Sequence, residues 1–427
     1  MATPVATPAP TLRGDRAFRK FWTAGSVSLA GTLVTSVVLP ILIYQRTGSA
    51  WQTSLLVAIE TIPYLAIGLV AGAVADRVDR RRLMWRCELV SALLVGSIPL
   101  AAAAGVLSIA QVYVVAAGTA TVFVWFDAAN FGALPAIAGR DRIAIAYARL
   151  SASSSVLMIA APALGGVLAS TIGPASAMAI DAASYVVSAL LLLSIRRPFS
   201  VPGAGPAVPA ARLRQRVMEG LRFLWHQSTV RSLTLLGFGN SLTLGAILGL
   251  MVVDANRQLG LARTSALIGA LYASGAVGAL VASVCLPPIM RRYSVLTITL
   301  IGLATELILV ITFALTTEVF IAMALYLGLN AASQAVILTG IIYRQQVTPD
   351  HLQGRVNVVA RMIAWGGQPF GAVLAGVVAS AISVRAALLA GGLGVVLSLA
   401  LCIARPVRIA AAGGLGAEPR RQHIDVH

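Results

Sequence analysis

Residues 72–84 read GAVADRVDRRRLM and hold two aspartates, Asp76 and Asp79, together with four arginines. The stretch in front of them, residues 53–75, carries a single charged side chain, Glu60. At about 1.5 Å per residue, a helix of this length crosses the hydrocarbon core of a bilayer, which is about 30 Å thick. An apolar run that ends in a dense group of charges indicates a membrane-spanning helix leaving the bilayer.

Similar apolar runs recur along the whole chain. Of its 427 residues, 58% are hydrophobic and only 11% are charged, and the mean hydropathy is +0.87. Because backbone polar groups in lipid must be hydrogen-bonded internally, such runs are expected to be helices. The sequence therefore predicts an all-α membrane protein with twelve transmembrane helices. We place the spans at residues 21–44, 53–75, 83–104, 109–131, 147–170, 175–195, 233–255, 265–289, 294–314, 318–343, 357–380 and 384–404.

The net charge of +17 is unevenly distributed between the predicted loops. Of the 32 Lys and Arg residues, 28 fall on the side of the two termini. The other side has only Arg46, Arg257, Arg263 and Arg385. This bias follows the positive-inside rule and places both termini in the cytoplasm of a multi-pass protein of the plasma (inner) membrane. It also explains the basic composition without a nucleic-acid partner.

Residues 196–232 form the one long interruption between spans. They begin with RRPFSVPGAGPAVPAA, whose four prolines predict a flexible linker. RLRQRVMEGLRFLWHQS follows, with apolar side chains at helical spacing, which predicts a basic amphipathic helix on the cytoplasmic leaflet. The expected organisation is a cytoplasmic tail (1–20, without a cleaved signal peptide), a six-helix bundle (21–195), this linker (196–232), a second six-helix bundle (233–404) and a cytoplasmic tail (405–427).

The two halves also resemble each other. The fifth span contains ARLSASSSVLMIAAPALGGVLAS, and the eleventh contains ARMIAWGGQPFGAVLAGVVAS. Pro162 and Gly166 in the first stretch recur in the same order as Pro369 and Gly376 in the second. A duplicated six-helix unit joined by a cytoplasmic linker is typical of secondary transporters, with a central site between the halves.

The opening stretch resembles the signature of the major facilitator superfamily between the second and third spans. The matching residues are Gly72, Asp76, Arg77, Arg80 and Arg81. Asp79 departs from the pattern, which has a glycine there. Other stretches resemble the subgroup of siderophore and macrolide exporters, the transmembrane secretion effectors. They are PILIYQRTGSAWQTSLL, FDAANFGALPAI, IDAASYVVSALLLLSIRRP, EGLRFLW and QGRVNVVARMIAWGGQPFGAVLAG. The resemblance extends from about residue 18 to residue 405.

The resemblance implies a latch on the cytoplasmic side. Asp76 would meet the start of the eleventh helix, whose N-terminus favours an anion, and Gly72 would let the second helix pack closely there. Arg80 or Arg81 would pair with Asp127 at the end of the fourth span. These contacts would hold the halves together in the outward-facing state. The alternative is that the arginines only anchor the topology.

A second motif bears on the direction of transport. AAPALGGVLA resembles the antiporter signature Gly-Pro-x-x-Gly-Gly through Pro162, Gly165 and Gly166, with Ala161 in place of the first glycine. A helix of small residues with a proline can bend and pack tightly against the other half, which would favour export. Ordinary small-residue packing is the alternative.

The driving force is expected to be a proton gradient. The chain has no Gly-x-x-x-x-Gly-Lys phosphate loop, and its only lysine is Lys20. A proton carrier within the membrane has to be an acid, and we take five acids in or at the ends of spans as candidates. They are Glu60, Asp127, Asp181, Asp254 and Glu306.

Glu60 is the first candidate among these acids. It shares one face of the second helix with Tyr64 and Gly72, and Pro63 beside it favours a bend toward the cavity. Asp181 is the second candidate, although hydrogen bonding between helices is the competing role. Asp254 is expected in solvent at the outer end of its span.

The first, fourth, seventh and tenth spans are expected to line the cavity. Its candidate polar residues are Ser28, Thr32, Thr35, Ser36, Asn240, Ser241, Thr243, Asn330, Ser333 and Gln334. No basic residue falls in mid-membrane, which favours an uncharged or cationic, largely apolar small molecule. We expect no enzymatic activity, because no catalytic triad is apparent, and neither a metal nor another cofactor, since the three cysteines lack metal-ligand spacing.

The sequence favours a monomeric, proton-coupled exporter of amphipathic small molecules, such as drugs, siderophore-like compounds or other lipophilic metabolites. Two alternatives stay open. One is an uptake symporter on the same fold, and the other is a membrane receptor or scaffold that transports nothing.

Overall fold

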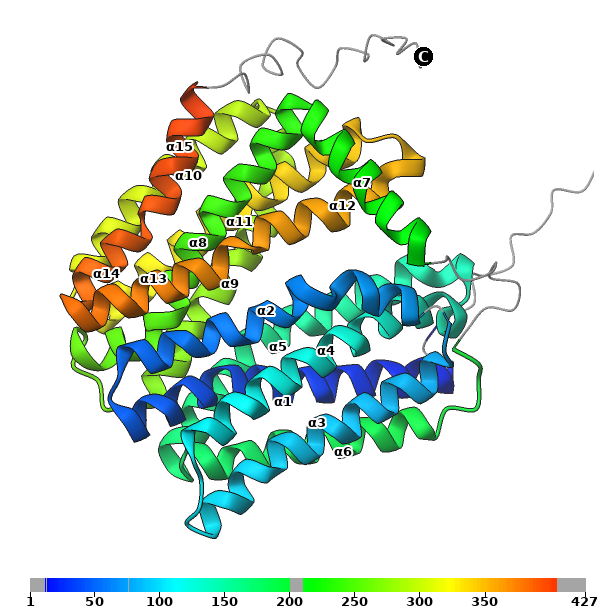
Figure 1. Cartoon of the computed structure of the whole chain (residues 1–427), viewed down its shortest axis with the longest axis horizontal. Coiled ribbons are helices and arrows are strands. Elements are labelled where there is room, and N and C mark those ends of the chain that lie inside the picture. Colours follow the sequence, from blue (N-terminus) through cyan, green and yellow to red (C-terminus); the bar gives the residue numbers. More distant parts are fainter. Residues whose placement is uncertain (1–11, 13, 76, 200–209, 405–427) are drawn as a thin grey trace, which may run out of the picture.

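The computed structural model describes residues 12, 14–75, 77–199 and 210–404. Within these residues the chain is helical between short turns. Figure 1 shows two groups of helices that converge at one end and diverge at the other. We call the side where α1 begins and α15 ends the terminal side, and the other side the distal side.

The first group comprises the helices before the linker. They are α1 (Arg16–Thr47), α2 (Ala50–Ala75), α3 (Arg80–Ala103), α4 (Ile109–Ala138), α5 (Ile143–Thr171) and α6 (Pro174–Leu193). The linker contains α7 (Ala210–His226). The second group comprises α8 (Ser228–Arg257), α9 (Ala266–Met290), α10 (Val295–Leu315), α11 (Val319–Val347), α12 (Asp350–Trp365), α13 (Gly367–Ala381), α14 (Val384–Gly391) and α15 (Leu393–Ala404).

The helices reproduce the predicted spans in order. Eleven segments of the described chain are long and apolar enough to cross a membrane, and α12 with α13, and α14 with α15, each count as one of them. The 26-residue α2 lies among them in the first bundle and supplies the twelfth span. The predicted all-α membrane fold of two six-helix bundles is therefore confirmed.

The helices extend beyond the ends of the spans that hydropathy predicted. α1 begins at Arg16 rather than at residue 21 because Asp15 caps it, with Oδ1 accepting from the amides of Ala17 (3.1 Å) and Phe18 (3.2 Å). Oδ2 of the same carboxylate pairs with Arg142 (3.4 Å) and Arg197 (3.0 Å). One aspartate thus ties together the terminal ends of α1, α5 and α6.

The bundles meet on the distal side through backbones that lie very close together. A Cβ atom on Gly166 of α5 would lie 2.8 Å from the Cα of Gly269 on α9. A Cβ atom on Gly376 of α13 would lie 2.9 Å from the Cβ of Ser54 on α2. The fifth span of each half therefore packs on the second span of the other half, which is the relation that a duplicated unit produces.

Two of the four basic residues of the distal side take part in this contact. Arg257 of the second bundle donates to the Tyr44 hydroxyl (3.2 Å) and to the carbonyl of Gly48 (3.0 Å) at the end of α1. Arg263 donates to the carbonyl of Gln45 (3.4 Å) and lies 5.4 Å from the centre of the Tyr44 ring. Cations at a helix C-terminus are favoured by the helix dipole, so these contacts help to close the distal side.

The linker helix α7 corrects one expectation. Its Leu224 is buried in a cluster with Val356 and Ala360 of α12, and Glu219 forms an ion pair with Arg355. The apolar face of α7 was expected to lie on the membrane leaflet, but α12 covers part of it, while Trp225 is 52% exposed. The amphipathic pattern reported a buried face without identifying what covers it.

Candidate functional site

A cavity of about 790 Å³ lies between the bundles. Residues of all six helices of the first bundle line it, but only Trp365 and Gln368 come from the second. It reaches the terminal ends of α1, α4 and α5 through Phe21, Leu134 and Tyr147. Because the distal side is closed by the contacts described above, the cavity is accessible from the terminal side.

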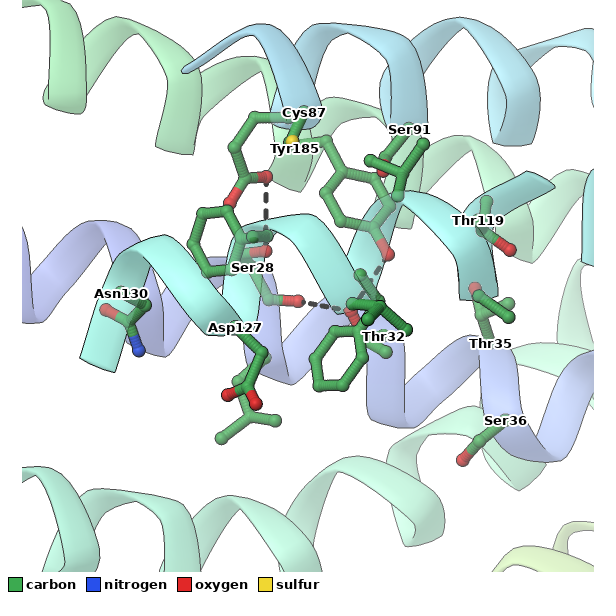
Figure 2. A pocket seen from close by; sticks show the side chains of 18 of the residues that line it. Ser28, Thr32, Thr35, Ser36, Cys87, Ser91, Thr119, Asp127, Asn130 and Tyr185 are labelled. Carbon is green, nitrogen blue, oxygen red and sulfur yellow. Dashed lines mark hydrogen bonds between the residues drawn. The ribbon is translucent and has the colours of Figure 1, made fainter. Parts of the chain in front are cut away.

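The lining agrees with part of the predicted set of residues. Ser28, Thr32, Thr35 and Ser36 of α1 line the cavity, as Figure 2 shows. The candidates from the second bundle do not belong to the lining. These residues are Asn240, Ser241, Thr243, Asn330, Ser333 and Gln334.

Hydrogen bonds within the second bundle explain this correction. Asn240 is fully buried and its Oδ1 accepts from the hydroxyl of Ser333 (2.8 Å). Thr243 donates to the carbonyl of Gly391 (2.8 Å), and Asn330 donates to the carbonyl of Tyr326, one turn earlier on α11 (2.9 Å). The first two hydrogen bonds join helices of the second bundle and the third lies within α11. Membership of a cavity-lining span was the only basis for the prediction.

Three carboxylates line the cavity, and no Lys, Arg or His belongs to the described lining. Glu60 comes from α2, Glu88 from α3 and Asp127 from α4. Aromatic rings, among them Phe123 and Trp365, make up much of the remaining wall. The cavity is therefore acidic and largely apolar.

Glu88 is the carboxylate that sequence analysis missed. It is 2% exposed, and its Oε2 accepts from the Ser28 hydroxyl (3.2 Å). It falls within the predicted span 83–104, close to the arginines of RRRLMWRCE, but was not among the acids considered as proton carriers. The available signal was periodicity, because Met84, Glu88, Ser91 and Val95 recur at helical spacing and are all buried.

Asp181 of α6 is buried beside α1 and does not line the cavity. Its Oδ2 accepts from Thr35 (2.5 Å) and its Oδ1 from Ser184 (3.2 Å). A Cβ atom on Gly31 would lie 2.2 Å from Oδ1, so the glycine lets α6 approach α1 this closely. Asp181 therefore forms a hydrogen bond between α6 and α1 through Thr35.

Asp254 and Glu306 belong to the second bundle and lie away from the cavity. Asp254 was expected in solvent but is 1% exposed, and the side-chain amide of Gln258 donates to its Oδ1. Glu306 is also 1% exposed, on α10. The distal end of α8 is enclosed by its neighbours, which hydropathy does not reveal.

The predicted latch is only partly within the described structure. Asp76 lies outside the described residues. A Cβ atom on Gly72 would have no heavy atom within 4 Å, so the expected close packing of α2 on the eleventh span is absent here, where the bundles diverge (Figure 1). Asp79, which replaces the glycine of the family pattern, caps α3 by accepting from the amide of Arg82 (3.0 Å).

The expected pairing of Asp127 with Arg80 or Arg81 is not formed within the described residues. Arg80 donates to the carbonyl of Gly132 (3.0 Å). Arg81 donates to the carbonyl of Leu192 (3.3 Å) at the end of α6, where carbonyls lack an intrahelical donor. Asp127 instead points into the cavity (Figure 2).

The antiporter-like motif lies at the closed distal contact. A Cβ atom on Gly269 of the other bundle would lie 2.3 Å from the carbonyl oxygen of Pro162. A Cβ atom on Gly165 would lie 3.0 Å from the carbonyl oxygen of Val34 on α1. Together with Gly166, these residues let α5 contact both α1 and α9 at backbone distance.

One further contact joins the halves beside the cavity. The rings of Tyr64 on α2 and Trp365 on α12 lie 5.3 Å apart. The guanidinium of Arg361 lies 5.0 Å from the centre of the Tyr64 ring and 5.6 Å from that of Trp365. This group sits one helical turn from Glu60, at an edge of the otherwise acidic cavity.

Comparison with solved structures identifies the fold class. The chain is similar to a bacterial homologue of the lysosomal transporter Spinster in an inward-facing, unoccupied conformation (TM-score 0.72, 16% identity, 94% of this chain and 96% of that one). It is also similar to a bacterial homologue of the iron transporter ferroportin in an inward-facing state (TM-score 0.71, 14% identity, 91% and 98%). The fold is that of the major facilitator transporters.

Sequence comparison identifies the family. The model of the transmembrane secretion effector family matches residues 6–422. The multidrug efflux pump Tap of Mycobacterium tuberculosis is 30% identical over 401 residues, which cover 89% of this chain and 91% of that protein. The enterobactin exporter EntS of Escherichia coli is 26% identical over 397 residues, covering 90% and 91%. The chain belongs to the transmembrane secretion effector family of the major facilitator superfamily.

Proposed function

We propose that this protein exports amphipathic small molecules across the plasma membrane, driven by a proton gradient and by alternating access. The observation that carries the proposal is the acidic, largely apolar cavity between two bundles that are closed on one side only. Such a cavity takes up a molecule from one side of the membrane, and separation of the distal contacts would release it on the other. The names of the relatives, a multidrug efflux pump and an enterobactin exporter, support export.

We place the terminal side in the cytoplasm, because 28 of the 32 basic residues fall on it. The cavity is then open to the cytoplasm, which is the state in which an exporter loads its cargo. The seal on the distal side faces outward. In the outward-facing state the signature residues Gly72, Asp76 and Arg77 would close the terminal side, as the family resemblance implies.

The preferred cargo is an organic cation or a neutral molecule with a large apolar surface. Three carboxylates and no basic residue line the described cavity, so an organic anion would be repelled unless its charge were masked. Aromatic walls provide area for stacking and cation–π contacts. We propose that the protein acts as a monomer without a cofactor.

Coupling to protons requires a carboxylate that binds and releases a proton during the cycle. Of the two candidates from the sequence, Glu60 lines the cavity directly, and Asp181 is buried behind α1. Both belong to the first bundle, on whose face the cavity lies. Either position supports exchange of a proton for a positively charged cargo.

The test is transport by the purified protein in proteoliposomes, with ethidium, a lipophilic fluorescent cation, as the probe. A pH gradient should drive ethidium uphill through wild-type protein, and collapse of the gradient with an ionophore should stop net movement. Movement of ethidium together with protons would indicate a symporter. Absence of flux for ethidium and for a panel of neutral amphipathic compounds would indicate a receptor or scaffold.

A further inference from the structure

Glu88 and Asp181 are two buried carboxylates of the first bundle that have no cationic partner. Glu88 is 2% exposed and Asp181 is fully buried. Neither forms an ion pair with any described residue, and the side chains that hydrogen-bond to them are hydroxyls. Two uncompensated negative charges this deeply buried are unfavourable, so a proton is the simplest way to neutralise one of them.

Hydroxyl groups on one face of α1 link the two acids. Ser28 donates to Glu88 (3.2 Å) and Thr35 to Asp181 (2.5 Å). Thr32 lies between them, donates to the carbonyl of Ser28 (2.9 Å) and lies 2.9 Å from the hydroxyl of Tyr185. The seven residue steps from Ser28 to Thr35 span about 10 Å of helix, a distance at which buried charges still interact.

Figure 2 shows Ser28, Thr32 and Thr35 in succession along α1, with Tyr185 reaching toward Thr32. The hydroxyls of Thr32 and Tyr185 are hydrogen-bonded to each other, and either can be the donor. The hydroxyls of Ser28 and Thr35 donate to the carboxylates.

The two acids differ in their access to the cavity. Glu88 belongs to the cavity lining, whereas Asp181 does not. The Oε1 atom of Glu88 is buried and has no hydrogen-bond partner among the described residues, and the same holds for the nearby hydroxyl of Ser188 on α6. A neutral Glu88 would carry a hydrogen on Oε1 that Ser188 can accept, so the site has a place for one proton.

We propose that Glu88 and Asp181 form the proton-binding site of this transporter, in which Glu88 exchanges the proton with the cavity and Asp181, through the hydroxyls of α1, keeps that proton bound when no cargo is present. The inference rests on the proposed function and assigns its coupling site. When an organic cation enters, the O–H bond of Glu88 breaks, the proton passes to water in the cavity, and the carboxylate left behind is neutralised by the cargo. Release of the cargo on the distal side lets Glu88 bind a proton again.

The titration of this pair has to be distinguished from that of other titratable groups nearby. Cys87 of α3 and Tyr185 of α6 are its neighbours within the bundle. Glu60 of α2, Asp127 of α4 and Tyr147 of α5 line the same cavity. Glu60 and Asp127 are the competing carriers because they also titrate as carboxylic acids.

The test is infrared difference spectroscopy of the full-length protein in lipid, which needs no knowledge of the cargo. Wild-type protein should show a carboxylic acid C=O band that disappears as the pH rises. Glu88→Gln should lose most of this band. Asp181→Asn should keep it but move its midpoint to lower pH, because a neighbouring negative charge has been removed.

Glu306→Gln is the matched control, since Glu306 is as buried as Glu88 but lies on α10, away from the cavity. It should keep the band and its midpoint. If Glu88→Gln does not fold, Ser28→Ala should still move the midpoint to higher pH, because the ionised carboxylate loses a donor. A band that is unchanged in Glu88→Gln, or one that disappears only in Glu60→Gln or Asp127→Asn, overturns the assignment.

Failure of the site and failure of the proposed function give different results. If gradient-driven ethidium transport occurs in wild type and continues unchanged in Glu88→Gln, transport is real and the assigned site is wrong. If wild type shows the titrating band but a pH gradient moves no cargo, the site binds a proton and the proposed coupling is wrong. The assignment expects at least a tenfold loss of gradient-driven ethidium transport in Glu88→Gln.

Discussion

The groups around a carboxylate in the membrane, more than its position along a span, determine whether it can bind cargo or hold a proton. Glu60 faces the cavity with no hydrogen-bond partner among the described side chains, whereas Glu88 is held by Ser28 and Asp181 by Thr35. A free carboxylate at a cavity wall is suited to contact a cationic cargo. Hydrogen-bonded, buried carboxylates are better suited to keep a proton.

We therefore expect Glu60→Gln to weaken cargo binding more than proton coupling. The KM for ethidium should rise by about three- to tenfold, corresponding to about 1 kcal/mol, because a charge interaction across the cavity is lost. The KM for a neutral substrate of similar size should change little. Initial rates in proteoliposomes at several substrate concentrations measure both, and loss of uphill transport with both KM values unchanged would make Glu60 the coupling site instead.

Predictions about single residues succeeded where the residue type itself limits the possible structure, as small residues do in a tightly packed helix. Pro162, Gly165 and Gly166 were selected as a tightly packed segment, and α5 does lie at backbone distance from both α1 and α9. Such predictions failed where a polar residue has several possible partners. Asn240 on a cavity-forming span bonds within its own bundle, because side-chain direction depends on packing angles that a single sequence does not contain.

At the scale of elements, the terminal ends of three helices depend on one aspartate. Burial alone raises the pKa of Asp15, but the amide of Phe18 and the guanidiniums of Arg197 and Arg142 outweigh it and hold the pKa below its ordinary value. A carboxyl group with a lowered pKa stabilises the folded state above its unfolded pKa, about 3.9, and loses that contribution as the pH falls through the folded value.

Asp15→Ala should consequently lower the thermal stability of the first bundle at neutral pH, by about 1–2 kcal/mol for the cap and the charged hydrogen bonds. The difference from wild type should shrink as the pH falls below about 4. Thermal unfolding of the purified protein at a series of pH values measures this. Asp141→Ala, at an exposed carboxylate of the neighbouring turn, is the control, and a difference that does not vary with pH would rule out the ion pairs.

The contacts that close the distal side can also be tested. Arg257 and Arg263 hold the C-terminal end of α1, so Arg257→Ala combined with Arg263→Ala should favour conformations with an open distal side. Charge-assisted hydrogen bonds contribute about 1.5–3 kcal/mol each when buried and less when exposed, so we expect about a tenfold shift in population. Spin labels on the distal ends of α1 and α8 report the distance. Arg385→Ala, a basic residue of the same side but on α14, should leave the distances unchanged, and an equal effect there would exclude a specific seal.

The order and approximate limits of the helices were predictable because lipid imposes length and hydropathy on each span. The partners of the linker helix were not, since an amphipathic face fits a membrane surface and another helix equally well. Leu224 illustrates this, because it is buried against α12 and not in lipid. The duplicated stretches with Gly166 and Gly376 predicted two equivalent halves, and the two glycines do make equivalent contacts, with α9 and with α2.

At the scale of the whole molecule, every conclusion about direction depends on which side of the membrane the termini occupy. The helices alternate in direction, so the turn after α3 lies on the distal side and the turn after α9 on the terminal side. Val106 in the first turn is 70% exposed, and Tyr293 in the second is 54% exposed. These two positions can report the orientation without disturbing the core.

We expect Val106→Cys to react with a membrane-impermeant maleimide in intact cells, and Tyr293→Cys to react only after the cells are permeabilised. The background is Cys285→Ser, which removes the exposed native thiol while Cys87 and Cys402 remain buried. The physical reason is that 28 basic residues lie on the terminal side against four on the distal side, and basic loops are retained in the cytoplasm during insertion. The opposite labelling pattern would place the termini outside, and the cavity described here would then load from the exterior. In that case uptake, and not export, would be the direction that this conformation serves.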